Sequence, residues 1–142
     1  MKNNYLSIVD FEIICSLLHN FFENFPDPSP DYRMSDFNKL DMIINAPKQT
    51  FGGQDLYPSI FHKGACYLYF INKFHPFNNG NKRVSIVSTY VFLRYNEYIL
   101  YVDNETLYKF AREIAQSKVS QEEDFNKVVE FLKKFSKSTK ET

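Results

Sequence analysis

The sequence predicts a single all-α domain of about six helices, with at most one small β-hairpin. Apolar residues recur every three or four positions along most of the 142 residues, which is the periodicity of helices that bury one face. Clusters of proline, glycine and asparagine separate these segments, as expected for the connecting loops. The length suits one domain with a core. We therefore expect one domain over residues 1–142, with a flexible tail over about 137–142.

The first predicted helix starts near Ser7 or Asp10. Its inward face carries apolar residues at helical spacing, namely Phe11, Ile14, Cys15, Leu18, Phe22 and Phe25. Three prolines then make a stiff loop, because proline cannot continue a helix; they are Pro26, Pro28 and Pro30.

A short helix is expected over residues 36–45, followed by a segment with weak extended character. This segment, APKQTFGGQDLYP, spans residues 46–58 and places Gly52 and Gly53 between two extended-looking stretches. Adjacent glycines favour the tight turn of a hairpin. The sequence therefore allows a small hairpin or flap at this point.

Four more helices account for the second half of the chain. One runs from Pro58, which suits a first helical turn, to about Phe74, and the next runs from about Asn81 to Tyr95. The helix over 81–95 is apolar on two sides, which is typical of a central helix in a bundle. Two amphipathic helices follow at 104–118 and 121–137, the latter opened by a capping box of Ser120 and Glu123.

Composition excludes several classes of protein. Lys plus Arg and Asp plus Glu both number 17, so the net charge is zero and exerts no long-range attraction on nucleic acid or anionic lipid. The sequence shows no signal peptide and no apolar run of the roughly 18 residues that a membrane span needs. Cys15 and Cys66 lie in apolar helical patterns and are expected to be buried thiols. We therefore expect a cytoplasmic protein.

The most distinctive stretch is the polar loop HPFNNGNKR, residues 75–83, between two apolar helices. The helix after it should present the backbone N–H groups of Gly80, Asn81 and Lys82 at its positively polarised N-terminus. Lys82 and Arg83 add two cations in the first turn, where a cation is unfavourable and an acid would be favourable. This arrangement predicts an anion site, with phosphate as the natural ligand.

His75 directly precedes the predicted anion site. An imidazole with a pKa near 6.5 can accept a proton at neutral pH, so His75 is a candidate general base. Asn78 and Asn79 offer amide oxygens that can face Mg²⁺. The alternative is a plain turn with a structural histidine, since Asn-Asn-Gly is a common turn sequence. His19 and His62 lack nearby metal-binding partners and are interpreted as structural.

The loop also resembles the signature of a known family. HPFNNGNKR is similar to the motif of the Fic/Doc family, in its Doc (death-on-curing) branch. Fic members carry His-x-Phe-x-Asp/Glu-Gly-Asn-Gly-Arg-x-x-Arg, whereas Doc members replace the second glycine with lysine and lack the final arginine. The corresponding residues here are Lys82 and Ile86. Similarity extends over nearly the whole chain, through the stretches YLS at 5–7, TFGGQDLYP at 50–58 and VFLRYNEYIL at 91–100.

This resemblance implies an all-α Fic fold with a hairpin flap and a specific activity. Doc members are kinases that move the γ-phosphate of ATP to a threonine of elongation factor Tu, which arrests translation. By resemblance, His75 is the general base and Asn79 holds the position of the acid that helps to bind Mg²⁺. The anion hole corresponds to Gly80, Asn81, Lys82 and Arg83, and the target-aligning flap to Phe51, Gly52, Gly53 and Gln54.

Three hypotheses remain open on the sequence. The first is a Doc-like toxin kinase, silenced by a separate antitoxin whose disordered C-terminal segment folds into a groove, because no inhibitory Ser/Thr-x-x-x-Glu-Gly/Asn segment is found. The second is an AMP transferase of the Fic type, against which Lys82 and Ile86 argue. The third is a catalytically weak module that binds its antitoxin or target. Asn79 supports it, since an amide lacks the charge of the usual acid and should bind Mg²⁺ more weakly.

Overall fold

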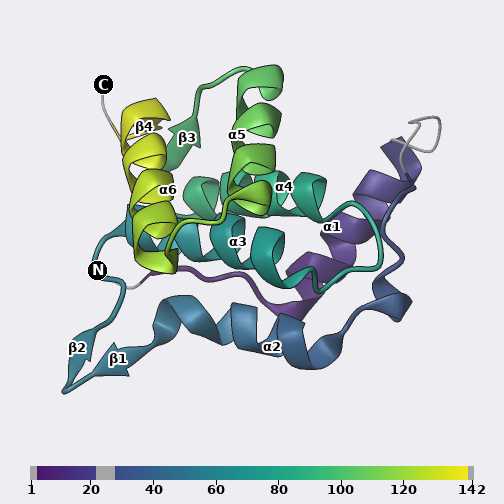
Figure 1. Ribbon diagram of the computed structural model, residues 1–142, viewed down its shortest axis with the longest axis horizontal. Helices are drawn as coiled ribbons and strands as arrows, with labels where there is room; N and C mark the ends of the chain where they lie inside the picture. The colour runs from purple at the N-terminus through teal and green to yellow at the C-terminus, as the bar shows by residue number, and fades with distance from the viewer. Residues whose placement is uncertain (1–2, 22–27, 141–142) are drawn as a thin grey trace.

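The computed structural model describes residues 3–21 and 28–140, and within them the chain is mainly helical (Figure 1). The all-α expectation is confirmed. The six α-helices of the described residues are α1 (Ile8–Phe21), α2 (Phe37–Asn45), α3 (Ile60–Phe74), α4 (Asn81–Tyr95), α5 (Asn104–Gln116) and α6 (Gln121–Phe135). Two short 3₁₀ turns, η1 (Tyr32–Met34) and η2 (Ala46–Lys48), flank α2. Phe22, Phe25 and Pro26, expected at the end of the first helix, lie outside the described residues.

Side-chain caps determine where several helices begin. Ser120 caps α6 by accepting the N–H of Glu123 at 3.2 Å, as the sequence predicts. Asp36 caps α2 in the same way through Lys39. The expected start of α3 at Pro58 is wrong: Ser59 is the cap, because its hydroxyl accepts the His62 N–H at 3.1 Å, and the helix begins at Ile60.

The core is built around α3, which Figure 1 shows in the middle of the molecule. Every residue from Lys63 to Asn72 is buried, so α3 is enclosed on all sides. The Tyr67 ring packs against Phe92 of α4 with centroids 5.0 Å apart, and its hydroxyl accepts the Leu6 N–H at 3.2 Å. These contacts fix α4 against α3, and thereby fix the loop that joins them.

Both cysteines are buried free thiols, as expected. Burial, with a smaller contribution from the charge of Asp31, raises the pKa of Cys15 to about 12. Burial also raises the pKa of Cys66, while the nearby Lys63 acts in the opposite direction. Neither thiol is therefore a nucleophile in the folded protein.

The expected hairpin is present between α2 and α3. Strands β1 (Thr50–Phe51) and β2 (Gln54–Asp55) pair antiparallel, with Phe51 opposite Gln54. Gly52 and Gly53 form the turn with φ angles of 59° and 81°, a combination that glycine adopts without strain. The adjacent glycines are therefore what allows so short a hairpin.

A second two-stranded sheet was not predicted. Strand β3 (Tyr98–Leu100) pairs antiparallel with β4 (Ser136–Ser138), and Thr139 N–H donates to Glu97 O at 2.8 Å. The predicted flexible tail was therefore wrong for Lys137 and Ser138. The polar sequence Ser-Lys-Ser carries no strand signal of its own, and its conformation comes from pairing with a distant segment. No helix in the described ranges is long and apolar enough to cross a bilayer.

Candidate active site

The loop between α3 and α4 begins with a backbone reversal at His75. His75 ends α3 in the left-handed region, with φ 50° and ψ 62°, and its N–H donates to Ile71 O at 3.1 Å. Residues other than glycine rarely adopt this conformation, and they do so mostly where the surrounding structure holds them. The reversal leaves His75 exposed at the helix end, where an incoming group can reach it.

Contacts on three sides hold the loop in place. The Phe77 side chain is 3% exposed and lies 6.0 Å from Phe11 between ring centroids, so it anchors the loop in the apolar core. Pro76 O accepts the Asp36 N–H at 2.7 Å, which joins the loop to α2. The Asn81 amide accepts the Phe77 N–H at 3.0 Å and donates to Phe77 O at 2.9 Å. The loop is therefore preorganised, and the Asn81 side chain is occupied in closing it.

Gly80 opens α4 and leaves its N-terminus accessible. It has φ 68° and no side chain caps the helix, whose first backbone bond runs from Val84 N–H to Gly80 O. A Cβ at Gly80 would lie 3.1 Å from both Pro30 Cδ and Arg83 Nη2. Glycine is therefore favoured by conformation and by the tight space, and the first N–H groups of α4 remain suited to an anion.

The two cations of the first turn have different surroundings. Arg83 is 9% exposed, and its Nη2 donates to Pro28 O at 2.6 Å, so part of its guanidinium anchors the segment before η1. Lys82 is half-buried and forms no ion pair within the described residues. Of the two, Lys82 is therefore the cation with charge available for a ligand.

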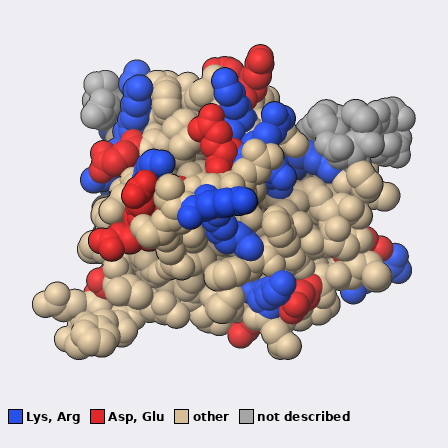
Figure 2. All heavy atoms as spheres, in the orientation of Figure 1, with Lys and Arg blue, Asp and Glu red and all other residues tan. Residues whose placement is uncertain are grey.

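The surroundings of His75 favour its neutral form. Partial burial lowers the imidazole pKa most, and the positive charges of Lys82, Lys39 and Lys73 lower it further. No acid is among these influences. Figure 2 shows Lys and Arg side chains across the middle of the drawn face, with acidic side chains among other cations over α5 and α6. A neutral imidazole beside cations suits both a proton acceptor and a bound anion.

Sequence reasoning missed Lys39 and Lys73. Lys73 forms a hydrogen bond of 2.8 Å to Ser117 O and lies 3.9 Å from a carboxylate oxygen of Asp124, so its charge is largely balanced. Lys39 belongs to α2 and reaches the vicinity of His75 only through the packing of α2 on the loop. No spacing rule in the sequence could have linked it to His75, which lies 36 positions further along.

The electrostatic setting predicts the titration of His75. We expect the pKa measured by NMR on the His75 imidazole to lie below the ordinary 6.5. In Lys39→Gln the pKa should rise, because a cation that disfavours the imidazolium has been removed. Lys127→Gln on α6 is the matched control and should leave it unchanged. A His75 pKa at or above 6.5 in the parent protein would contradict this account.

Of the two asparagines expected to face a metal, only Asn79 fits. Asn78 Oδ1 already accepts the Asp31 N–H at 3.0 Å, whereas the half-buried Asn79 side chain forms no hydrogen bond within the described residues. The described residues contain no group of three His, Cys, Asp or Glu side chains that could hold a metal ion. Asn79 therefore has an uncommitted amide oxygen, which is a type of ligand that Mg²⁺ accepts.

Comparison with known proteins supports the motif. The model of the Fic/DOC family matches residues 8–93, which include the hairpin, α3, the loop and α4. The chain belongs to this family. It is also similar to a curated protein named Toxin Doc from Mycolicibacterium smegmatis, with 30% identity over 66 residues. The match covers 46% of this chain and 51% of the relative, so the chain spans about half of the relative's length. No solved structure matches significantly.

The segment that resembles the family's flap does not lie beside His75. The hairpin of Phe51, Gly52, Gly53 and Gln54 precedes the N-terminus of α3, whereas His75 follows its C-terminus. Figure 1 shows β1 and β2 well away from the loop that joins α3 to α4. Because α3 has 15 residues, its two ends are about 22 Å apart. Phe51 is 83% exposed. The structure therefore separates the expected flap residues from the other expected site residues.

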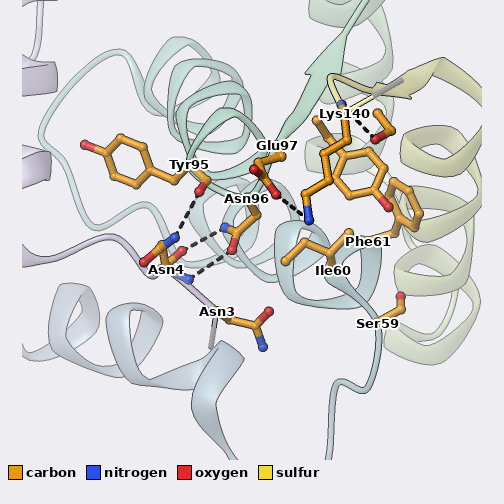
Figure 3. Close-up of a pocket in the computed structure, with 11 residues that line it drawn as sticks. Asn3, Asn4, Ser59, Ile60, Phe61, Tyr95, Asn96, Glu97 and Lys140 are labelled. Atoms are coloured by element: carbon orange, nitrogen blue, oxygen red, sulfur yellow. Dashed lines mark hydrogen bonds and ion pairs between the residues drawn. The ribbon is translucent and has the colours of Figure 1, made fainter. Parts of the chain in front are cut away.

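Of two larger cavities in the described residues, one adjoins the Fic/Doc motif and the other does not. A groove of about 660 Å³ between α4 and α5 is lined by Leu18, Ile86, Val87, Tyr108 and Arg83, so it adjoins the motif. A pocket of about 540 Å³ lies at the hairpin end of α3 (Figure 3), where the Asn96 amide is hydrogen-bonded to the backbone of Asn4 and Lys140 is paired with Glu97 at 2.8 Å. His75 lines neither cavity, and Arg83 is the residue through which the first cavity adjoins the motif.

Proposed function

We propose that this protein is a Doc-like toxin that transfers the γ-phosphate of ATP to a hydroxyl of a translation factor, elongation factor Tu by resemblance, in the cytoplasm. The observation that carries the proposal is the exposed His75, held directly before an uncapped helix N-terminus and beside Lys82. A proton acceptor close to a helix end suited to an anion is the arrangement that phosphoryl transfer needs, and this supports the proposal. Membership of the Fic/DOC family and the similarity to a protein named Toxin Doc support it.

In the proposed reaction, residues of the loop and of the first turn of α4 act on ATP and the target hydroxyl. His75 accepts the proton of the target hydroxyl, whose oxygen forms a bond to the γ-phosphorus while the bond to the β-bridging oxygen breaks and ADP leaves. The N–H groups of Gly80, Asn81, Lys82 and Arg83 line the open end of α4 and stabilise the transferred group. Asn79 would hold Mg²⁺ together with the ATP phosphates, and the ion supplies positive charge there.

Lys82 favours transfer of the terminal phosphate over transfer of AMP. A glycine at this position would leave the backbone open to a bridging pyrophosphate, whereas lysine fills that space and adds a charge. The family's AMP-transferring members have glycine there, and this chain has a half-buried lysine in the first turn of α4. The bulk of the side chain therefore restricts how ATP can lie, and it leaves the terminal phosphate nearest His75.

The hairpin and His75 can act on the same target only if the target is extended. A strand rises about 3.3 Å per residue, so roughly seven extended residues bridge the length of α3. We propose that the target segment pairs with an edge of the hairpin and continues to His75. Exposed strand edges accept an added strand in this way.

A toxin of this kind requires a partner that silences it. We propose an antitoxin with a C-terminal segment that is disordered when free and folds on binding. The apolar groove lined by Ile86, Val87 and Tyr108 suits such a segment, and it borders Arg83 of the motif. A segment in this groove would lie close enough to the anion site to obstruct ATP.

The decisive test uses ATP labelled on either the α- or the γ-phosphate. Purified protein is incubated with elongation factor Tu or with a cell lysate, and His75→Ala protein serves as the control. Transfer of γ-label to one protein band supports the kinase. Transfer of α-label would instead indicate an AMP transferase, and no transfer in either case would leave a binding module.

Restoring the acid at position 79 should strengthen the metal site. Asn79→Asp is expected to lower the Mg²⁺ concentration that gives half-maximal transfer, because ligand charge raises affinity for hard cations. Asn78→Asp is the matched control, since Asn78 Oδ1 is committed to the Asp31 N–H. An unchanged Mg²⁺ dependence in Asn79→Asp would remove Asn79 from the metal site.

A further inference from the structure

Lys63 is a buried charge that the catalytic loop does not use. It lies in α3 and is 1% exposed. A buried ammonium group is costly unless it is paired and hydrogen-bonded. Lys63 Nζ meets this requirement through three acceptors: Pro47 O at 3.4 Å, Tyr57 O at 2.5 Å and a carboxylate oxygen of Asp55 at 3.1 Å. One lysine therefore satisfies two backbone carbonyls and forms an ion pair.

These three acceptors lie on both sides of the hairpin. Pro47 precedes β1, Asp55 is the last residue of β2, and Tyr57 lies between β2 and α3. The ammonium group thus joins the two legs of the hairpin at their base and fixes them to the central helix. A single side chain from the core accordingly determines where the hairpin leaves the helices.

The hairpin has little else to hold it. Its two strands pair over only two residues each, and one further bond runs from Leu56 N–H to Gln49 O at 2.9 Å. An isolated two-stranded hairpin is marginally stable in water. Space around its turn is open, since a Cβ at Gly52 or Gly53 would meet no atom within 4 Å. The direction of the hairpin therefore depends on its base.

We propose that Lys63 is a positioning residue that holds the hairpin in the orientation needed to dock the protein target. Its role in docking rests on the proposed function, whereas the anchoring rests on the contacts of Lys63 alone. The Asp55 side chain is about half exposed, so the ion pair between Lys63 and Asp55 lies at the protein surface. The two backbone carbonyls that accept from Lys63 Nζ bind the buried side of the ammonium group.

Hydrogen exchange tests the anchoring without any assay of activity. In Lys63→Met the Leu56 N–H should exchange about 10- to 100-fold faster than in the parent protein, because the charge-assisted bonds at the hairpin base are lost. In Asp55→Asn, which removes only the ion pair, the increase should be smaller. Core amides of α3 and α4 should keep their rates. Lys73→Met is the matched control, since this lysine of α3 bonds to Ser117 O and not to the hairpin.

The same variants separate docking from a general loss of stability. Asp55→Asn should raise the KM for the protein target several-fold and leave the KM for ATP unchanged, because His75 and the anion site lie at the other end of α3. Unchanged exchange at Leu56 in Asp55→Asn and in any folded Lys63→Met protein would overturn the anchoring. Faster exchange with an unchanged target KM would overturn the docking role. Absence of phosphoryl transfer in the parent protein would overturn the proposed function while leaving the exchange result intact.

Discussion

Replacing His75 is expected to lower the rate of phosphoryl transfer by roughly 10²–10⁴-fold, which is the usual contribution of a positioned general base. His75→Ala removes the imidazole, and His75→Asn removes it while keeping a residue that tolerates the left-handed conformation observed there. Both variants should keep the far-UV circular dichroism of the parent, because an exposed side chain at a helix end contributes little to the core. Single-turnover rates with labelled ATP measure the effect.

His62 provides the matched control for this experiment. It lies in α3 and bonds to Ser59 Oγ at 2.6 Å, far from the loop, so His62→Ala should transfer phosphate at close to the parental rate. A loss within threefold in folded His75→Asn protein would contradict the assignment of His75 as the base. An equal loss in His62→Ala would point to a general effect on the fold.

Replacing Lys82 should cause the second largest decrease in the rate of phosphoryl transfer. Lys82→Ala removes the charge and keeps helix propensity, and γ-phosphate transfer should fall by roughly 10²–10³-fold, as when one donor to a developing anion is lost. Lys82→Gly loses the same charge and also opens space at the backbone, so it alone should form a trace of AMP-modified target. Mass spectrometry of the target distinguishes added phosphate from added AMP.

Two outcomes would contradict this role of Lys82. Unchanged phosphorylation by Lys82→Ala would show that the charge of Lys82 does not stabilise the transition state, and Lys82 would then have no role in transfer. Equal amounts of AMP product from the alanine and glycine variants would show that backbone space does not decide how ATP lies. Lys82→Arg, which keeps the charge, serves as the control for side-chain size.

The sequence predicted the central helices α3 and α4 well because residues close to their ends mark where the loop between them begins and ends. Gly80 is the last residue of the loop and α4 begins at Asn81. The predicted helix over residues 81–95 therefore agrees with the structure. The Gly52-Gly53 turn encoded the hairpin in the same local way. Burial of the two cysteines followed from their place in apolar stripes. All of these features depend on residues that are neighbours in the chain.

Features that depend on distant pairing could not be predicted. Strand β4 is defined by its pairing with β3, in which Lys137 lies opposite Ile99, and nothing in Ser-Lys-Ser itself favours a strand. The approach of Lys39 to His75 results from the packing of α2. The separation of the hairpin from His75 follows from the straight course of α3 between them, whereas a motif shows only that both segments are present.

The two buried cysteines make the protein its own reporter of opening. A thiol-labelling reagent reacts only with an exposed thiolate, so Cys15 and Cys66 can be labelled only when α1 or α3 leaves the core. Cys66 lies in the enclosed central helix, whereas Cys15 lies in α1 at the edge of the bundle. Comparison of their labelling rates would show whether α1 detaches before the rest of the molecule unfolds, without any introduced probe.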